Sequence, residues 1–171
     1  MTKSEVQTEI LNANIFVIDD EEIATEYMSL CLTEAGFTKV HGFQDPVEAF
    51  ETLSCVEADL ILTDVNMPEL GGKFLIRLAR KMPHLRDTPI IAITSDHSEM
   101  TRDRLLANGV TEVLVKPIGK DQLAKIVTDL LKFHCLANQN SKQDENNLRK
   151  KSVTKVKEKE QVLWEAFDRK S

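Results

Sequence analysis

The chain of 171 residues is 42% hydrophobic and 29% charged, which is typical of a soluble globular domain with some additional length. Its net charge of −6 is uneven, because residues 137–171 hold 9 Lys and Arg against 6 Asp and Glu, which leaves −9 for the other 136 residues. The acidic body disfavours DNA binding. No run approaches the roughly 18 apolar residues of a membrane span, and the polar start is unlike a signal peptide. We therefore expect a cytoplasmic protein without membrane contact.

Short apolar runs alternate with longer amphipathic segments over residues 14–134. Strands are expected at 15–18, 40–43, 60–62, 90–93 and 113–115, several of them apolar almost throughout, as in strands covered on both faces. Apolar residues at helical spacing lie between the strands: Ile23, Tyr27, Leu30 and Cys31; Phe74, Leu78 and Met82; Leu123, Ile126, Val127, Leu130 and Leu131. Five strand–helix repeats predict an α/β, flavodoxin-like, doubly wound parallel sheet of strand order 2-1-3-4-5.

The regions outside the repeats are expected to form separate segments. Residues 1–13 read as an N-terminal extension, and residues 135–171 as a polar linker followed by an amphipathic stretch. That stretch is compatible both with a disordered tail and with a helix that docks or forms a coiled coil. Its aromatic residues Trp164 and Phe167 are predicted to contact a partner or the domain itself, which leaves homodimer formation open.

Polar side chains follow four of the five expected strands at their carboxyl ends: Asp19 and Asp20, Asp64, Thr94 and Ser95, and Lys116. In open parallel sheets, ligands bind outside these strand ends, at the point where the strand order reverses. The expected strand order brings the first, third, fourth and fifth strand ends together there. The second strand, an edge in that order, contributes no such residue.

These side chains predict chemistry on a phosphoryl group. Carboxylates that share a cleft repel one another unless a cation neutralises them, and Mg²⁺ prefers oxygen ligands. With Mg²⁺ bound, Asp64 can act as a nucleophile that forms an aspartyl phosphate. Lys116 would supply positive charge to the phosphoryl oxygens, and the Thr94 hydroxyl would donate a hydrogen bond to them.

Four separated motifs carry a resemblance to the response regulator receiver family: Ile18-Asp19-Asp20, Thr63-Asp64-Val65-Asn66-Met67-Pro68, Ile93-Thr94-Ser95 and Val115-Lys116-Pro117. Their order and their intervals of 44, 30 and 22 residues between Asp20, Asp64, Thr94 and Lys116 are ordinary for that family. The resemblance covers residues 14–134, and within the family the chain is similar in kind to the chemotaxis regulators. It implies a phosphoprotein of two-component, phosphorelay signal transduction rather than an enzyme that acts on other substrates.

The resemblance also implies a role for each matching residue. Asp20 and Asp64, with the backbone carbonyl of Asn66, would hold Mg²⁺, and Asp19 would act partly through water. Asp64 would accept the phosphoryl group from a histidine kinase or a histidine phosphotransfer protein. Thr94 would swing toward the phosphate on activation, with Ser95 beside it, and the bond before Pro117 would be cis.

The position two residues after Asp64 is Asn66, and the position two residues after Thr94 is Asp96. In the family these two positions tune hydrolysis of the phosphate, and a polar pair there implies a phosphorylated lifetime of seconds to minutes. Two departures concern the output of the signal. Val113 stands where most members carry an aromatic residue, and Gly71 replaces an aspartate that caps a helix, a loss of about 1 kcal/mol.

Two functional hypotheses remain open from the sequence. The first is a stand-alone receiver that switches its contacts with an unknown downstream protein when Asp64 is phosphorylated. The second is a phosphorylation-independent scaffold that works through Trp164 and Phe167, which the missing aromatic at Val113 favours. The three cysteines and four histidines are scattered without metal-ligand spacing, so they predict no further metal site.

Overall fold

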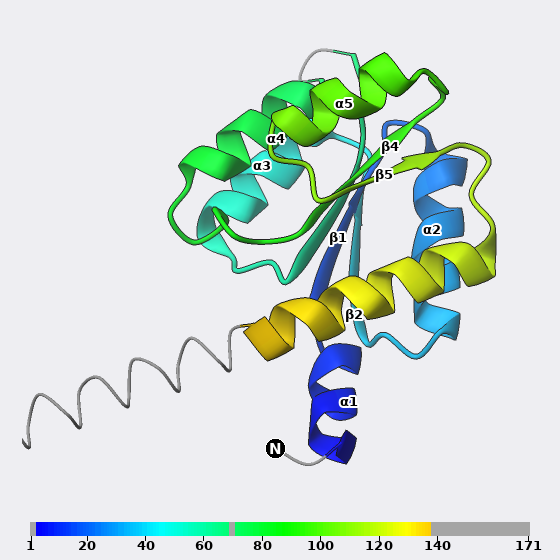
Figure 1. Ribbon diagram of the computed structural model, residues 1–171, viewed down its shortest axis with the longest axis vertical. Helices are drawn as coiled ribbons and strands as arrows, with labels where there is room; N and C mark the ends of the chain where they lie inside the picture. Colours follow the sequence, from blue (N-terminus) through cyan, green and yellow to red (C-terminus); the bar gives the residue numbers. More distant parts are fainter. Residues whose placement is uncertain (1–2, 69–70, 138–171) are drawn as a thin grey trace, which may run out of the picture. The chain divides into compact units, whose positions relative to one another are not determined.

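The computed structural model describes residues 3–68 and 71–137, and its centre is a parallel sheet of five strands in the order β2-β1-β3-β4-β5 (Figure 1). The strands are β1 (Asn14–Ile18), β2 (Lys39–Phe43), β3 (Leu60–Asp64), β4 (Ile90–Thr94) and β5 (Glu112–Val115). The predicted α/β fold and strand order are therefore confirmed. The order reverses between β1 and β3, which are paired although α2, β2 and α3 lie between them in the chain.

The described residues also form five labelled helices and one further helical stretch. They are α1 (Lys3–Leu11), α2 (Glu22–Glu34), α3 (Pro46–Cys55), α4 (Gly72–Lys81), α5 (Glu99–Ala107) and residues 120–137. By its internal contacts the chain divides into a unit of residues 1–133 and a second unit of residues 134–171. Residues 135–137, at the start of the predicted linker segment, are helical, and the remainder of that segment, with Trp164 and Phe167, lies outside the described residues. Within the described ranges, no helix is both long and apolar enough to cross a lipid bilayer.

The sheet buries a separate apolar cluster on each of its two faces. Alternate residues of β1 point in opposite directions, so Val17 belongs to one cluster and Phe16 to the other. The first cluster includes Met28 and Leu32 of α2 with residues 123, 127 and 131 of the last helical stretch. The second is covered by α3, α4 and α5. Burial on both faces explains why β3 and β4 are apolar almost throughout.

In two helices, the apolar residues that the helical spacing groups together do not all face the sheet. In α2, Cys31 is buried as expected, but Ile23 is 81% exposed and Leu30 58% exposed, because the row that faces the sheet includes Thr25, Met28 and Leu32. In α4, Phe74 is 44% exposed, whereas Leu75, Ile76 and Ala79 are buried. Both helices carry two apolar rows, and only one row can face the sheet. By contrast, residues 123, 127 and 131 are buried as the periodicity predicts.

The N-terminal segment is ordered as a helix that packs on the domain. Ile10 of α1 is buried in the first apolar cluster, and the Thr38 amide donates to the Leu11 carbonyl at 2.9 Å. After α2 the chain turns at Gly36, whose φ of 100° is the left-handed conformation expected at a helix end. These contacts close the sheet at the end opposite to the polar residues described next.

Candidate functional site

Four of the predicted site residues converge where the carboxyl ends of the strands meet. Asp19 follows β1, Asp64 ends β3, Thr94 ends β4 and Lys116 follows β5. The register places Asp64 opposite Ile93, and Thr94 opposite Val115. Asp19, Asp64 and Thr94 are 0%, 5% and 1% exposed, although all three are polar. Buried polar groups of this kind require partners, so their contacts define the site.

Lys116 is the shared partner of two carboxylates. Its Nζ lies 2.8 Å from Oδ2 of Asp19 and 3.0 Å from Oδ1 of Asp64. Burial disfavours the charged form of the Lys116 side chain and lowers its pKa. The hydrogen bonds to Asp19 and Asp64 outweigh this effect, so the pKa of Lys116 is raised. The lysine therefore stays protonated and holds the two acids together across the point where the strand order reverses.

Backbone amides and a glycine fix the remaining atoms of the two acids. The Asn66 amide donates to Oδ2 of Asp64 at 2.6 Å, and the Glu21 amide donates to Oδ1 of Asp19 at 3.0 Å. Behind Asp64, α4 begins at Gly72, and a Cβ at that residue would lie 1.9 Å from the Asp64 carbonyl oxygen. The absence of a side chain there allows the helix start to press directly against the end of β3.

Thr94 is linked to both the lysine and the following loop. Its carbonyl accepts from the Lys116 amide at 2.9 Å, and its Oγ1 accepts from the Asp96 amide at 3.1 Å. The peptide bond between Lys116 and Pro117 is cis. The Asp96 side chain turns away toward α5, where it accepts from the Ser98 amide and from the Thr101 hydroxyl.

Three predicted residues lie at the rim rather than inside the cluster. Asp20, Asn66 and Ser95 are exposed, although the Asn66 amide contacts the buried Asp64. Val113, the replacement for the family's aromatic residue, is buried in β5. Gly71 precedes α4 without a side-chain cap, which agrees with the loss predicted for that helix.

The chemistry of the donors fits a hard cation. Asp19 and Asp64 offer carboxylate oxygens, and Mg²⁺ is commonly held by one or two carboxylates together with water or phosphate oxygens. In the part of the chain that is described, no three His, Cys, Asp or Glu side chains gather as a metal cluster. Lys116 already contacts both buried acids, so a cation would bind with only a few protein ligands.

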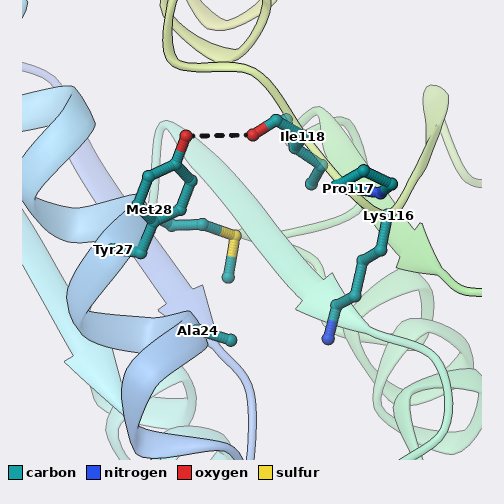
Figure 2. Close-up of a pocket in the computed structure, with 6 residues that line it drawn as sticks. All are labelled: Ala24, Tyr27, Met28, Lys116, Pro117 and Ile118. Atoms are coloured by element: carbon teal, nitrogen blue, oxygen red, sulfur yellow. Dashed lines mark hydrogen bonds between the residues drawn. The ribbon is translucent and has the colours of Figure 1, made fainter.

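A pocket of about 520 Å³ opens beside Lys116, between α2 and the segment after β5 (Figure 2). Its lining is mainly apolar: Ala24, Tyr27, Met28, Lys116, Pro117 and Ile118. At its rim, the Tyr27 hydroxyl donates to the Ile118 carbonyl at 3.0 Å. The sequence pattern gave no sign of this pocket, because helical spacing alone does not show that Tyr27 lies beside Pro117 and Ile118.

Comparison with known proteins places this chain in a family. The sequence profile of the response regulator receiver domain matches residues 15–128. The chain is 35% identical over 124 residues to the cyclic di-GMP phosphodiesterase response regulator RpfG of Xanthomonas campestris, a match that covers 72% of this chain and 33% of that protein. This chain thus spans a third or less of the length of the first curated relatives that it matches.

Solved structures give the same result at the level of the fold. The chemotaxis protein CheY4 of Vibrio cholerae has a TM-score of 0.66 and 28% identity, covering 70% of this chain and 98% of that one. The receiver domain of a Pseudomonas aeruginosa sensor histidine kinase, crystallised with magnesium in its active-site cleft, has a TM-score of 0.64 and 25% identity over 70% of this chain and 98% of its own. The chain therefore belongs to the response regulator receiver domain family.

Proposed function

We propose that this protein is a signalling switch that accepts a phosphoryl group on Asp64 from a phosphorylated histidine of a kinase or phosphotransfer protein. The observation that supports this proposal best is the buried pair of Asp19 and Asp64 on one ammonium group of Lys116. A carboxylate at a strand end, beside a cation, is suited to nucleophilic attack on phosphorus. Protein–protein contacts, rather than DNA, are the proposed output.

The transfer step balances without any redox partner. One carboxylate oxygen of Asp64 forms a bond to phosphorus, while the bond between phosphorus and the histidine nitrogen breaks. The electron pair of that bond stays on the imidazole, which is neutral after it takes up a proton from water. Hydrolysis reverses the modification, because water attacks the phosphorus and the Asp64 carboxylate leaves. The protein mainly positions the reacting groups and stabilises charge.

Each neighbour of Asp64 has a proposed part in this step. Asp20 and Asp64, the carbonyl of Asn66 and, through water, Asp19 would hold Mg²⁺, which when bound supplies positive charge to the phosphoryl oxygens. The Lys116 ammonium, now hydrogen-bonded to Asp64, would contact a phosphoryl oxygen after transfer. The Thr94 hydroxyl would turn toward another. The hydrolysis rate, for which we propose a lifetime of seconds to minutes, would depend on Asn66 and Asp96.

The outer surface of α2 supports docking of the phosphodonor at this end of the sheet. Ile23, Tyr27 and Leu30 form an exposed apolar stripe at spacings of four and three residues, on the helix that borders the pocket beside Lys116. A helix of the donor that carries the phosphohistidine can pack against such a stripe. The phosphoryl group would then arrive beside Lys116 and Asp64.

The decisive experiment is intact-mass measurement after incubation with acetyl phosphate and Mg²⁺. The wild-type chain should gain one phosphoryl group, and Asp64→Asn should gain none. Asp129→Asn, which changes an exposed acid on the last helix, is the matched control and should label like the wild type. EDTA should prevent labelling. Failure of the wild type to label, alongside a receiver that does, would refute the proposal and favour the phosphorylation-independent scaffold.

A further inference from the structure

The hydroxyl of Thr94 is held by the loop that connects β4 with α5. Thr94 is 1% exposed, and its Oγ1 accepts from the Asp96 amide at 3.1 Å. If the side chain rotates toward a phosphoryl group on Asp64, Oγ1 moves away from that amide. The hydrogen bond between Asp96 and Thr94 therefore favours the unphosphorylated position of the hydroxyl, and whatever fixes Asp96 also fixes Thr94.

The Asp96 carboxylate is fixed by two donors from the start of α5. Its Oδ1 accepts from the Ser98 amide at 2.8 Å, and its Oδ2 accepts from the Thr101 hydroxyl at 2.5 Å. The bond from Thr101, followed by those from Ser98, lowers the pKa of Asp96 to about 2, so the carboxylate is ionised at neutral pH. Charge-assisted hydrogen bonds of this kind are stronger than bonds between neutral groups.

Ordinary capping of α5 does not require the Thr101 hydroxyl. The helix is capped by Ser98, whose Oγ accepts from the Thr101 amide at 3.3 Å. The Thr101 hydroxyl instead reaches back to Asp96, outside the helix. This additional contact joins the first turn of α5 to the loop that holds Thr94.

The rest of α5 is lightly attached to the domain. Leu105 is its one buried residue, while Met100 is 59% exposed. Arg102 contacts the Val113 carbonyl at 3.1 Å and Glu112 at 2.9 Å. With a small residue at 113, the family's aromatic side chain is not present to link Thr94 with this face. The path through Asp96 and Thr101 is a direct hydrogen-bonded connection between Thr94 and α5.

We propose that Thr101 is a positioning residue for the phosphorylation switch: through Asp96 it holds Thr94 in the resting position and couples the movement of Thr94 to α5. This inference rests on the proposed function of Asp64. Rotation of Thr94 toward the phosphoryl group releases the Asp96 amide, and the loosened loop weakens the contact between Asp96 and Thr101. Conversely, a protein without the Thr101 hydroxyl starts with a looser loop and reaches the active position more readily.

The test compares Thr101→Val, which removes the hydroxyl at nearly constant shape, with Thr101→Ser, which keeps it. Thr52→Val is the matched control, because it removes a threonine hydroxyl that bonds within α3. Two quantities are measured: the rotamer populations of Thr94 from NMR couplings in the unphosphorylated protein, and the rate of labelling by acetyl phosphate with Mg²⁺. Thr101→Val should populate a second Thr94 rotamer and label about fivefold faster, because the loss of one hydrogen bond of about 1 kcal/mol changes an equilibrium by about that factor. Thr101→Ser and Thr52→Val should match the wild type.

The possible failures are distinguishable. If the wild type labels and Thr101→Val leaves both the rotamers and the rate unchanged, the positioning role is wrong. Equal changes in Thr101→Val and Thr101→Ser would also overturn it, since Thr101→Ser keeps the hydroxyl and the effect would then not depend on that group. If the wild type does not label, the proposed function fails. In that case the comparison of Thr94 rotamer populations between the wild type and Thr101→Val still tests whether Thr101 positions Thr94.

Discussion

Gly72 provides a strict steric test of the site, because it lies at the start of α4 directly against the backbone of Asp64. A Cβ on Gly72 would be 1.9 Å from the Asp64 carbonyl oxygen and 2.9 Å from its carbonyl carbon. It would also be 3.0 Å from Cα of Val65. All three atoms belong to the backbone, so no side chain can rotate to make room. The change Gly72→Ala therefore has to move either the end of β3 or the start of α4.

The size of this movement follows from the distances. Real Cβ contacts essentially never fall below 3.0 Å, so the carbonyl oxygen at 1.9 Å has to move by at least about 1 Å. Overpacking of this kind costs about 1–3 kcal/mol, against at most about 1 kcal/mol gained from the better helix propensity of alanine. A shift of about 1 Å at Asp64 would also disrupt its 3.0 Å contact with the ammonium of Lys116. A misplacement of about 1 Å can lower a reaction rate on the order of 100-fold.

Two assays check this reasoning, with Gly71→Ala as the matched control. At Gly71 an added Cβ would meet its nearest atom, the Met67 carbonyl oxygen, at an ordinary 3.6 Å. Urea unfolding followed by circular dichroism should show a loss of about 1–2 kcal/mol for Gly72→Ala and less than about 1 kcal/mol for Gly71→Ala. Acetyl phosphate labelling should drop sharply only in Gly72→Ala. Wild-type stability and labelling in Gly72→Ala would refute the steric argument.

Three further predictions concern charge and docking. Lys116→Met leaves the buried Asp19 without its cation and should lower the unfolding free energy by about 2–3 kcal/mol in urea titrations; an unchanged midpoint would contradict this. The pKa of Asp96 is lowered from 3.8 to about 2 by the hydrogen bonds that its carboxylate accepts. The stability that these bonds give to the folded protein is therefore present above pH ~4 and is lost as the pH falls toward 2. Thermal unfolding at pH 5 to 2 should therefore be less acid-sensitive in Thr101→Val, and equal sensitivity would refute the assignment. Ile23→Lys should slow labelling by a histidine-phosphorylated donor protein about tenfold while labelling by acetyl phosphate stays unchanged, whereas equal slowing would exclude α2 as the docking surface.

The fold could be predicted because its strongest signals are local. The near-continuous apolar runs at β3 and β4 reflect burial on both faces, and Gly36 marks a helix end that its backbone conformation requires. Helix faces were harder, since α2 carries two apolar rows of similar strength. Periodicity identifies such rows but does not say which one faces the sheet. The exposed row at Ile23 and Leu30 became visible only when the packing was known.

In the candidate site, too, some features could be predicted from the sequence and others depend on packing. Asp19, Asp64, Thr94 and Lys116 were expected to converge because strand order alone brings their positions to one edge of the sheet. The contact of Gly72 with the Asp64 carbonyl has no sequence signature, because it depends on how closely α4 approaches β3. The reach of the Thr101 hydroxyl to Asp96 likewise depends on the path of the loop rather than on residue types.

Charge balance connects the buried cluster with the need for a cation. Asp19, Asp64 and Lys116 together carry a net charge of about −1 when all three are ionised, and Lys116 contacts both acids. Conversion of Asp64 to an acyl phosphate replaces one negative charge by about −1.5 to −2, so the cluster would approach −2 in a site that is mostly removed from water. An uncompensated buried charge of that size is strongly unfavourable. A divalent cation would bring this balance close to zero, which is a physical argument for the proposed dependence of the phosphorylated state on Mg²⁺.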